Sequence, residues 1–199
     1  MNNQVMYQFT YGLFVLMARE GEKENGCIIN TAMQVTSSPN RVMIAVNKQN
    51  YTHDMIERTR EFNVCILNEQ APFAVFKRFG FQSGRDGNKL EGCKVKHSEN
   101  NIAYIEEYSC AYLSGKVIQT VDVNTHTVFI AEVTAAELVA GGTPVTYGYY
   151  QDHIKPKPEK TEKVGYRCKI CGYIYEGEPL PEDFVCPICK HGAEDFRRI

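Results

Sequence analysis

Two Cys-x-x-Cys pairs carry the most specific chemistry in this sequence. Cys168 and Cys171 form the first pair, and Cys186 and Cys189 form the second pair. Four thiolates at this spacing can surround one metal ion with tetrahedral geometry. The spacing alone leaves zinc and iron open, but it predicts a metal centre in this part of the chain.

The predicted metal ligands lie in a segment that is too small to fold on a hydrophobic core alone. Residues 151–164 are mostly polar or charged and include Pro156 and Pro158, so we expect an extended linker there. The linker separates a body of residues 1–150 from a tail domain of residues 165–199. A domain of that size usually needs a metal or disulfides for stability, which agrees with the predicted metal centre.

Composition and charge exclude several classes of protein. The net charge is −2 for 199 residues, and no basic stripe indicates nucleic-acid binding. No stretch approaches the ~20 apolar residues of a membrane-spanning helix, and the N-terminus does not resemble a signal peptide. We therefore expect a cytoplasmic protein with no membrane or nucleic-acid partner. Because cytosolic thiols stay reduced, we expect structural roles for the scattered Cys27, Cys65, Cys93 and Cys110.

The body is dominated by short apolar runs that are typical of β-strands. The runs that we expect to form strands are residues 42–46, 62–67, 111–121 and 126–138. Two short helices are predicted, at residues 52–60 with Thr52 as the N-cap, and at residues 71–78 with Pro72 near the start. Many strands with few helices indicate a mainly β protein, built as a barrel or a sandwich.

Two polar clusters in the body could bind a phosphate-bearing cofactor. Lys48 and Thr52 follow a predicted strand and lie at the start of a predicted helix, where a cation, a hydroxyl and backbone N–H groups converge. Ser83 and Arg85 lie in a polar loop, and an arginine can bind phosphate through two parallel hydrogen bonds. Neither cluster is specific by itself, because such spacings also occur in ordinary loops.

Several motifs follow one another along the body in a distinctive order. Residues 25–39 begin with Asn-Gly and end with Ser-Ser-Pro, and an apolar strand, Asn47-Lys48 and Thr52-His53 come next. A later strand begins at His126 and continues to Ala-Glu-Val at residues 131–133. Over roughly residues 1–150 this order resembles the flavin reductase-like family. The resemblance implies an FMN-binding split β-barrel with a few short helices.

The resemblance also implies which residues hold the flavin. Next to the isoalloxazine ring it places Asn30, Thr31, Ala32 and Gln34. Toward the ribityl chain and phosphate it places Ser37, Ser38, Asn47, Lys48, Thr52, His53, Ser83 and Arg85. It places His126, as the catalytic residue, near the ring, where the nicotinamide of NADH or NADPH would stack. Family members are typically homodimers with flavin at the interface, so we expect a homodimer that binds FMN.

The tail sequence has further features around its cysteines. Gly172 and two tyrosines follow Cys171, an acidic segment follows them, and Pro187 lies inside the second pair. These residues resemble rubredoxin, with a short loop between the pairs as in rubrerythrins. Lys190 occupies a position where that family often has glycine, and Phe184 replaces the usual Trp. The resemblance favours iron over zinc, as one Fe(Cys)4 centre per chain.

The two resemblances together imply an electron-transfer protein. NAD(P)H would reduce bound FMN, and electrons would pass singly to the rubredoxin iron and then to an external redox protein. By resemblance, that acceptor is a flavodiiron protein that reduces oxygen or nitric oxide, or a peroxide-detoxifying enzyme. We expect the acidic tail surface to meet a basic patch on the acceptor. Two alternatives stay open: a free-flavin reductase with an accessory metal domain, and a non-catalytic flavin-binding protein with a structural zinc ribbon.

Overall fold

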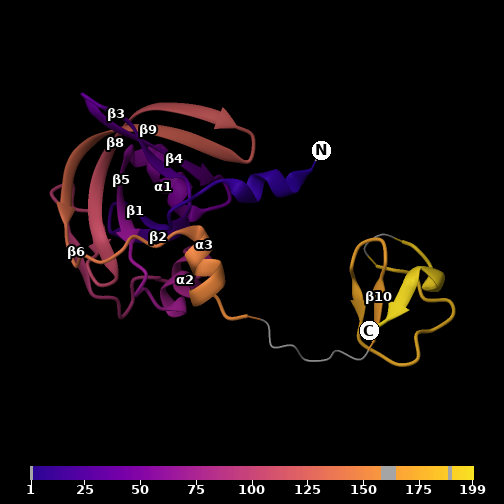
Figure 1. The fold of residues 1–199 in the computed structure, drawn as a ribbon. Coiled ribbons are helices and arrows are strands. Elements are labelled where there is room, and N and C mark those ends of the chain that lie inside the picture. Colours follow the sequence, from indigo (N-terminus) through magenta and orange to yellow (C-terminus); the bar gives the residue numbers. More distant parts are fainter. Residues whose placement is uncertain (1, 158–164, 188–189) are drawn as a thin grey trace. The chain divides into compact units, whose positions relative to one another are not determined.

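The protein consists of two compact units, which a computed structural model describes for residues 2–157, 165–187 and 190–199 (Figure 1). The body is Met1–Pro156 and the tail unit is Lys157–Ile199. Residues 151–156 therefore belong to the body, although the sequence analysis expected them in the linker. Residues 158–164 of the expected linker lie outside the described residues.

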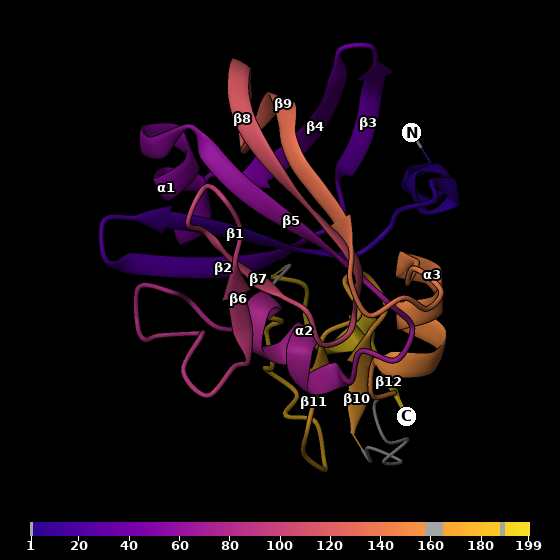
Figure 2. The ribbon, with the colours of Figure 1, turned by 90° about the vertical axis from the view of Figure 1, so that its left-hand side faces the viewer.

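One seven-stranded sheet forms the frame of the body. Its strands lie in the order β2, β1, β5, β8, β9, β4 and β3, and every pair is antiparallel. Figure 2 shows the long strands β8 and β9 side by side, with the β3–β4 hairpin continuing the sheet beyond β9. A separate hairpin joins β6 and β7. The strands are Phe14–Glu20 (β1), Lys23–Ile29 (β2), Ala32–Ser37 (β3), Asn40–Asn47 (β4), Glu61–Leu67 (β5), Val95–His97 (β6), Ala103–Ile105 (β7), Ser109–Val123 (β8) and His126–Leu138 (β9). The predicted mainly β architecture is confirmed.

The helices of the body are short. They are η1 (Asn3–Gln8), α1 (Tyr51–Thr59), α2 (Phe73–Gly80), α3 (Tyr147–Tyr149) and η2 (Tyr150–Ile154). Both predicted helices exist, but the prediction of Thr52 as an N-cap was wrong. Asn50 occupies that position with an extended backbone, and Thr52 is already helical and fully buried. No helix in the described ranges has the length and apolar character that crossing a membrane requires.

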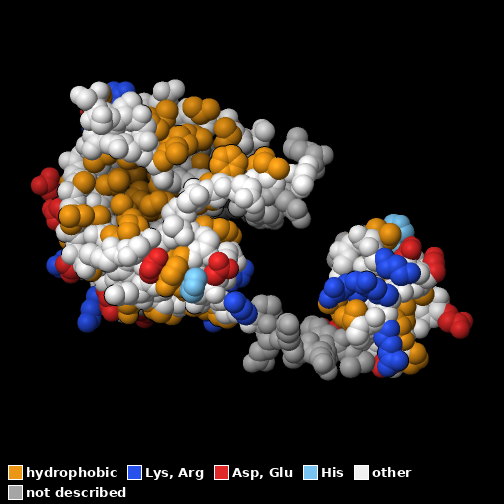
Figure 3. All heavy atoms as spheres, in the orientation of Figure 1, with side chains coloured by type: hydrophobic (Ala, Val, Ile, Leu, Met, Phe, Trp, Pro, Cys, Tyr) orange, Lys and Arg blue, Asp and Glu red, His pale blue; other side chains and the backbone are white. Residues whose placement is uncertain are grey.

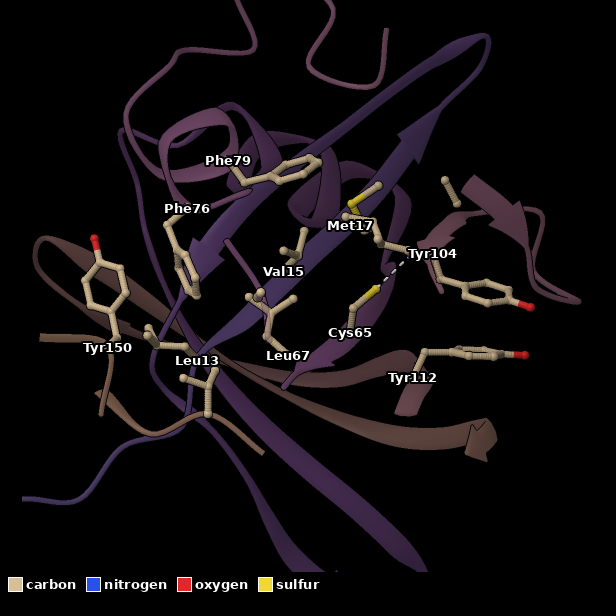
Figure 4. Packing of buried hydrophobic residues seen from close by; sticks show 14 of the residues in the cluster. Leu13, Val15, Met17, Cys65, Leu67, Phe76, Phe79, Tyr104, Tyr112 and Tyr150 are labelled. Carbon is tan, nitrogen blue, oxygen red and sulfur yellow. Dashed lines mark hydrogen bonds between the residues drawn. The ribbon is translucent and has the colours of Figure 1, made fainter. Parts of the chain in front are cut away.

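Strands β1 and β5 are buried on both faces, and a separate hydrophobic core lies on each side of them. Met17 and Cys65 pack in the first core under α2 and the β6–β7 hairpin, whereas Leu16 and Val64 pack in the second core. In Figure 4, Tyr104 and Tyr112 stack at one edge of the first core, with ring centroids 3.9 Å apart. Burial on both faces explains why these strands are continuous apolar runs, not alternating ones.

The tail unit is a small three-stranded sheet with connecting loops. Its strands lie in the order β11 (Ile174–Tyr175), β10 (Tyr166–Cys168) and β12 (Phe196–Arg198), and η3 (Ala193–Asp195) precedes β12. Its buried hydrophobic cluster is formed by Cys168, Cys186 and Phe196, with half-buried aromatic rings around them. A core of this size supplies little hydrophobic stabilisation, so the fold depends on what the cysteines bind.

Candidate functional site

Three of the four predicted metal ligands lie together in the tail unit. The Sγ atoms of Cys168, Cys171 and Cys186 all lie within 4.8 Å of one another, and those of Cys171 and Cys186 are 3.5 Å apart. Cys168 and Cys186 are buried, whereas Cys171 is exposed. The fourth predicted ligand, Cys189, lies outside the described residues. Three thiols at these distances fit a tetrahedral thiolate shell around one metal ion.

The residue that follows each Cys-x-x-Cys pair has a positive φ and makes the same backbone hydrogen bond. The N–H of Gly172 donates to the carbonyl oxygen of Cys168 at 3.0 Å, and the N–H of Lys190 donates to that of Cys186 at 3.0 Å. The backbone angle φ is +78° at Gly172 and +63° at Lys190. The second turn therefore needs the left-handed conformation that glycine adopts most easily, and Lys190 adopts it instead.

A polar cluster surrounds the start of α1. The Arg85 Nη2 atom lies 2.6 Å from Asp54 Oδ2, and the guanidinium lies over the ring of Tyr51, 5.0 Å from its centroid. His53 is 3% exposed, and its Nδ1 and Nε2 atoms lie 3.2 Å from Asp54 Oδ1 and 2.9 Å from Thr127 Oγ1. Burial alone would raise the pKa of Asp54, but the hydrogen bonds from Arg85 and His53 outweigh it and lower that pKa.

Thr52 and His53 lie inside the body and not on its surface. Thr52 is 0% exposed, and its hydroxyl oxygen accepts a hydrogen bond of 2.8 Å from the Asn25 side chain. Both ring nitrogens of His53 also have partners. Direct contact with a cofactor phosphate would require these hydrogen bonds to open. The phosphate-binding roles of these two residues therefore stay predictions.

Two residues that the sequence analysis did not select hold the loop that carries Ser83 and Arg85. Lys89 is buried, and its Nζ donates to the carbonyl oxygens of Gly26 at 2.9 Å and Phe79 at 3.2 Å. Burial lowers the pKa of Lys89. The other residue is Asn25, whose side chain packs so closely on the backbone of Gly84 that a Cβ there would collide with it. Asn25 belongs to the motif that suggested the family, whereas nothing in a polar loop reveals that one of its lysines is buried.

A polar cavity of about 600 Å³ opens beside this cluster. Its lining includes Tyr51, Gly84 and Arg85 together with Glu22 and Glu24. Ser83 accepts a hydrogen bond of 3.1 Å from the backbone N–H of Arg85, which orders the turn of the loop. Arg85 is therefore the predicted phosphate ligand that the structure places at an accessible cavity.

Asn47, Lys48 and His126 come together at the end of β4. Asn47 and His126 lie directly opposite each other on β4 and β9. The Nζ of Lys48 lies 2.6 Å from Asp122 Oδ2, and its backbone N–H donates to the carbonyl oxygen of Thr125. The β8–β9 turn thus brings His126, which was predicted to lie near the nicotinamide, next to Asn47 and Lys48, which were predicted to bind the flavin.

The predicted ring-binding residues lie along β3. Ala32 and Gln34 help to line an apolar groove of about 260 Å³ between β3, β4 and the strands β1, β5, β8 and β9. In Figure 3 the surface of the body in this region is also hydrophobic and hollowed. Gln34 donates to Asn40 at 2.9 Å, and the Thr31 hydroxyl donates to the carbonyl oxygen of Ala45 at 2.7 Å. Asn30 is half-buried just before β3. The apolar walls fit a flat aromatic ring such as isoalloxazine.

Ser37 and Ser38 lie far from the other predicted phosphate residues of the same chain. They form the exposed tip of the β3–β4 hairpin, whereas Asn47 ends β4 and Lys48 follows it. The eight residues of β4 span about 25 Å at roughly 3.3 Å per residue. One chain therefore does not bring these serines and Lys48 to the same phosphate.

Comparisons with known proteins agree with both parts of this arrangement. The model of the flavin reductase-like domain family matches residues 6–157, and that of the rubrerythrin, rubredoxin-like domain matches residues 166–197. The high molecular weight rubredoxin of Moorella thermoacetica is 35% identical over 229 aligned positions, with 100% of both chains covered. A ferric-chelate reductase (NAD(P)H) of Archaeoglobus fulgidus is 29% identical over 85% of this chain and 100% of its own length.

A solved structure shows the same fold for the body. Flavoredoxin from Methanosarcina acetivorans superimposes with a TM-score of 0.63 at 23% identity, over 73% of this chain and 79% of its own. The match to the family model covers most of the body, and the cysteine cluster lies in the segment that matches the rubredoxin-like model. The chain therefore belongs to the flavin reductase-like family and carries a C-terminal rubredoxin-like domain.

Proposed function

We propose that this protein is an oxidoreductase that passes electrons from NAD(P)H through bound FMN to an iron centre and then to an external acceptor. The observation that carries the proposal is the presence in one chain of a flavin reductase-like body and a cluster of metal-binding cysteines. The name of the Archaeoglobus relative, a ferric-chelate reductase that uses NAD(P)H, supports nicotinamide as the electron source. Bound FMN would supply the step from two-electron to one-electron chemistry.

The residues of the body would bind and orient the flavin and the nicotinamide. The groove at Ala32 and Gln34 would exclude water from the ring, and Arg85 at its cavity would hold the phosphate. His126 lies opposite Asn47 at the end of β4, where it would position the nicotinamide. No side chain needs to act as a general acid or base, because hydride transfer depends mainly on orientation.

The tail unit would hold one iron through Cys168, Cys171, Cys186 and Cys189. Iron is favoured over zinc because the tail matches the rubredoxin-like domain, and in iron–thiolate centres backbone N–H groups close to the sulfurs help to set the reduction potential. Such N–H groups stabilise the more negatively charged, reduced form of the centre. The exposed Cys171 would give the metal a short path to a partner at the surface.

A homodimer would reconcile the separated flavin residues. On the outer face of the sheet, Met33 pairs with Met43, Met43 with Ile130, and Val121 with Val128. Met33 is 55% exposed and Val121 is 42% exposed. Exposed apolar side chains that lie together are common at subunit interfaces. His126 and Asn47 lie at the end of this face. In a dimer, the hairpin tip with Ser37 and Ser38 would reach the flavin of the partner subunit.

We propose a flavodiiron protein or a peroxide-detoxifying enzyme as the acceptor, and the cytoplasm as the location. The acceptor is proposed from the resemblance alone. The location is proposed because thiols stay reduced in the cytosol. A second candidate function is a free-flavin reductase, in which flavin leaves as product. It is favoured by one observation: Lys48 and Arg85, the cations available for the phosphate, are both paired with carboxylates. Competition from Asp122 and Asp54 would weaken flavin retention.

The visible absorption spectrum of the anaerobic protein, before and after NADH is added, tests the proposal. Bleaching of both the flavin and ferric-thiolate bands is expected. If the flavin bleaches while the ferric-thiolate bands persist, the internal electron path does not exist. Gel filtration before the measurement separates the two candidates, because the free-flavin reductase would lose its flavin on the column.

A further inference from the structure

The outer face of the tail sheet carries two arginines that repel each other. Arg167 on β10 lies directly opposite Arg197 on β12, and both side chains are exposed. Like charges at directly opposed positions of neighbouring strands lower stability. Within the described part of the chain, neither guanidinium group has an ion-pair partner. The arrangement is unfavourable for the isolated unit, so it calls for a function.

The register of the sheet shows that these arginines point away from the core. The next pair along the strands is Cys168 opposite Phe196, and both of these side chains are buried. Because side chains alternate between the faces of a strand, Arg167 and Arg197 project from the other face. Lys169 follows on the same chain segment, and its Nζ donates to the backbone carbonyl of Glu194. We call Arg167, Lys169 and Arg197 the basic face; Figure 3 shows Lys and Arg side chains gathered on the viewed side of this unit.

The basic face flanks the ligand Cys168 along the chain. Arg167 and Lys169 directly precede and follow the ligand Cys168 in the sequence, and Arg197 follows the residue that pairs with it. The Cys168 side chain points to the opposite face, so a partner bound at the basic face would be separated from this ligand by the backbone of β10.

Two acidic residues, Glu194 and Asp195, lie close to the basic face, where their backbone carbonyls accept hydrogen bonds from Lys169. The other acidic residues of the segment 165–199 lie in a separate loop. Glu176, Glu178, Glu182 and Asp183 lie in the loop between the two cysteine pairs, and Glu178 forms an ion pair with Arg198. Arg198 is thus neutralised while its neighbour Arg197 is not. The sequence analysis expected acidic residues to form the docking surface, and the structure points to a different face.

We propose that the basic face is the docking surface for an acidic patch on a redox protein acceptor. The inference rests on the proposed electron-transfer function and specifies the charge of the partner. Carboxylates placed between Arg167 and Arg197 would remove their repulsion, and complementary charge would speed association. In the docked complex one electron leaves the metal centre, which is oxidised, and enters the acceptor, which is reduced. No bond or proton needs to move.

A binding titration tests the surface. Poly-L-glutamate, an acidic polypeptide, is titrated into the zinc-loaded, isotope-labelled full chain at low ionic strength, and amide shifts are followed by NMR. The shifts are expected to centre on the basic face and to fade with added salt. In Arg167→Glu/Arg197→Glu the affinity should fall by about tenfold or more. The control Lys77→Glu/Lys94→Glu makes the same change of charge at two exposed lysines of the body and should bind like the wild type.

A single substitution that is not expected to weaken the fold separates loss of binding from loss of folding. Arg197→Glu alone turns the repelling pair into an attractive one, so it should retain the metal at least as well as the wild type while still weakening polyglutamate binding. Unchanged polyglutamate binding in both basic-face variants would overturn the proposal. The proposal would also be overturned if poly-L-lysine bound at residues 176–183 with higher affinity than polyglutamate binds at the basic face.

The iron-loaded protein separates this inference from the proposed function. NADH should bleach the metal bands of Arg167→Glu/Arg197→Glu as fast as those of the wild type, because the basic face is assigned to an external acceptor. Slower bleaching in this variant would mean that the face serves electron entry from the flavin, which overturns the external-partner assignment. If even the wild type does not bleach, the proposed function fails, and the polyglutamate result stands apart from that failure.

Discussion

Lys190 repeats, at the second Cys-x-x-Cys turn, the backbone conformation of Gly172 at the first. Each residue has a positive φ, and each donates its backbone N–H to the first cysteine of its pair at 3.0 Å. A side chain in this conformation costs about 1 kcal/mol relative to glycine. The two Cys-x-x-Cys pairs are therefore followed by one strained residue, Lys190, and one relaxed residue, Gly172.

Replacing Lys190 with glycine should strengthen metal retention. Relief of about 1 kcal/mol corresponds to roughly a fivefold slower release of metal to a chelator, if all of the strain is relieved on release. The loss of the metal–thiolate absorption with time measures this rate. The opposite change, Gly172→Ala, introduces strain at the matching position and should speed release. If Lys190→Gly releases its metal as fast as the wild type, the strain assignment is wrong.

Removing the metal should unfold the tail unit and leave the body folded. The tail core contains Cys168, Cys186 and Phe196 as its buried hydrophobic residues, which is too little to hold a fold alone. In NMR spectra of the chelator-treated full chain, the resonances of Phe196 should collapse toward random-coil positions. The resonances of Tyr104 and Tyr112, which stack in the body, should keep their chemical shifts. Dispersed tail signals without metal would contradict this expectation.

Arg85→Ala should weaken FMN binding by roughly 10- to 100-fold, because a hydrogen bond to a charged group contributes about 1.5–3 kcal/mol. The dissociation constant can be measured by quenching of flavin fluorescence. The matched control is Arg58→Ala, which removes another exposed, ion-paired arginine that bonds Glu20 and does not line the cavity. Equal losses in both variants would show that Arg85 acts through general stability and not through the phosphate.

Asp54→Asn should destabilise the body in a pH-dependent way. The pKa of Asp54 lies below its usual value of 3.8, because hydrogen bonds from Arg85 and His53 outweigh burial. The ionised carboxylate therefore stabilises the fold fully above 3.8, and this contribution is lost as the pH falls through the lower folded-state pKa.

Urea unfolding at several pH values checks this sign. The stability difference between wild type and Asp54→Asn should be constant in the neutral range and shrink in acid. Glu57→Gln, which neutralises an exposed carboxylate on the same helix, is the matched control. A difference that grows as the pH falls would contradict the assignment.

Cys27 and Cys65 should resist alkylation in the folded protein. Burial raises the pKa of Cys27 to about 11 and that of Cys65 to about 12. Only a thiolate reacts readily, so at about pH 8 these thiols are almost entirely unreactive. Mass spectrometry after brief iodoacetamide treatment measures the modification, with the half-buried Cys93 as an internal comparison. Rapid labelling of Cys65 would show that the first core opens frequently.

Some of the candidate site could be predicted because it depends on short sequence separations. Cys168 and Cys171 share one tight turn, and Cys186 accepts the same backbone hydrogen bond from Lys190, so the cysteine cluster follows from local spacing. The strand that begins at His126 was also predictable, since its apolar run and the turn before it are local features. Sequence could not show that Lys89 is buried, because its partners at Gly26 and Phe79 come from other elements.

By itself, the sequence determined the mainly β body, the cysteine-rich tail, and the family to which the motifs belong. Only the tertiary structure decided which of the predicted site residues meet. The register of β4 against β9 pairs Asn47 with His126, while the length of β4 separates Ser37 from Lys48. Register and strand length place residues that are distant in the chain, and they result from packing both faces of the sheet. The opposition of Arg167 and Arg197 has the same origin, because two strands far apart in sequence must pair before their charges can meet.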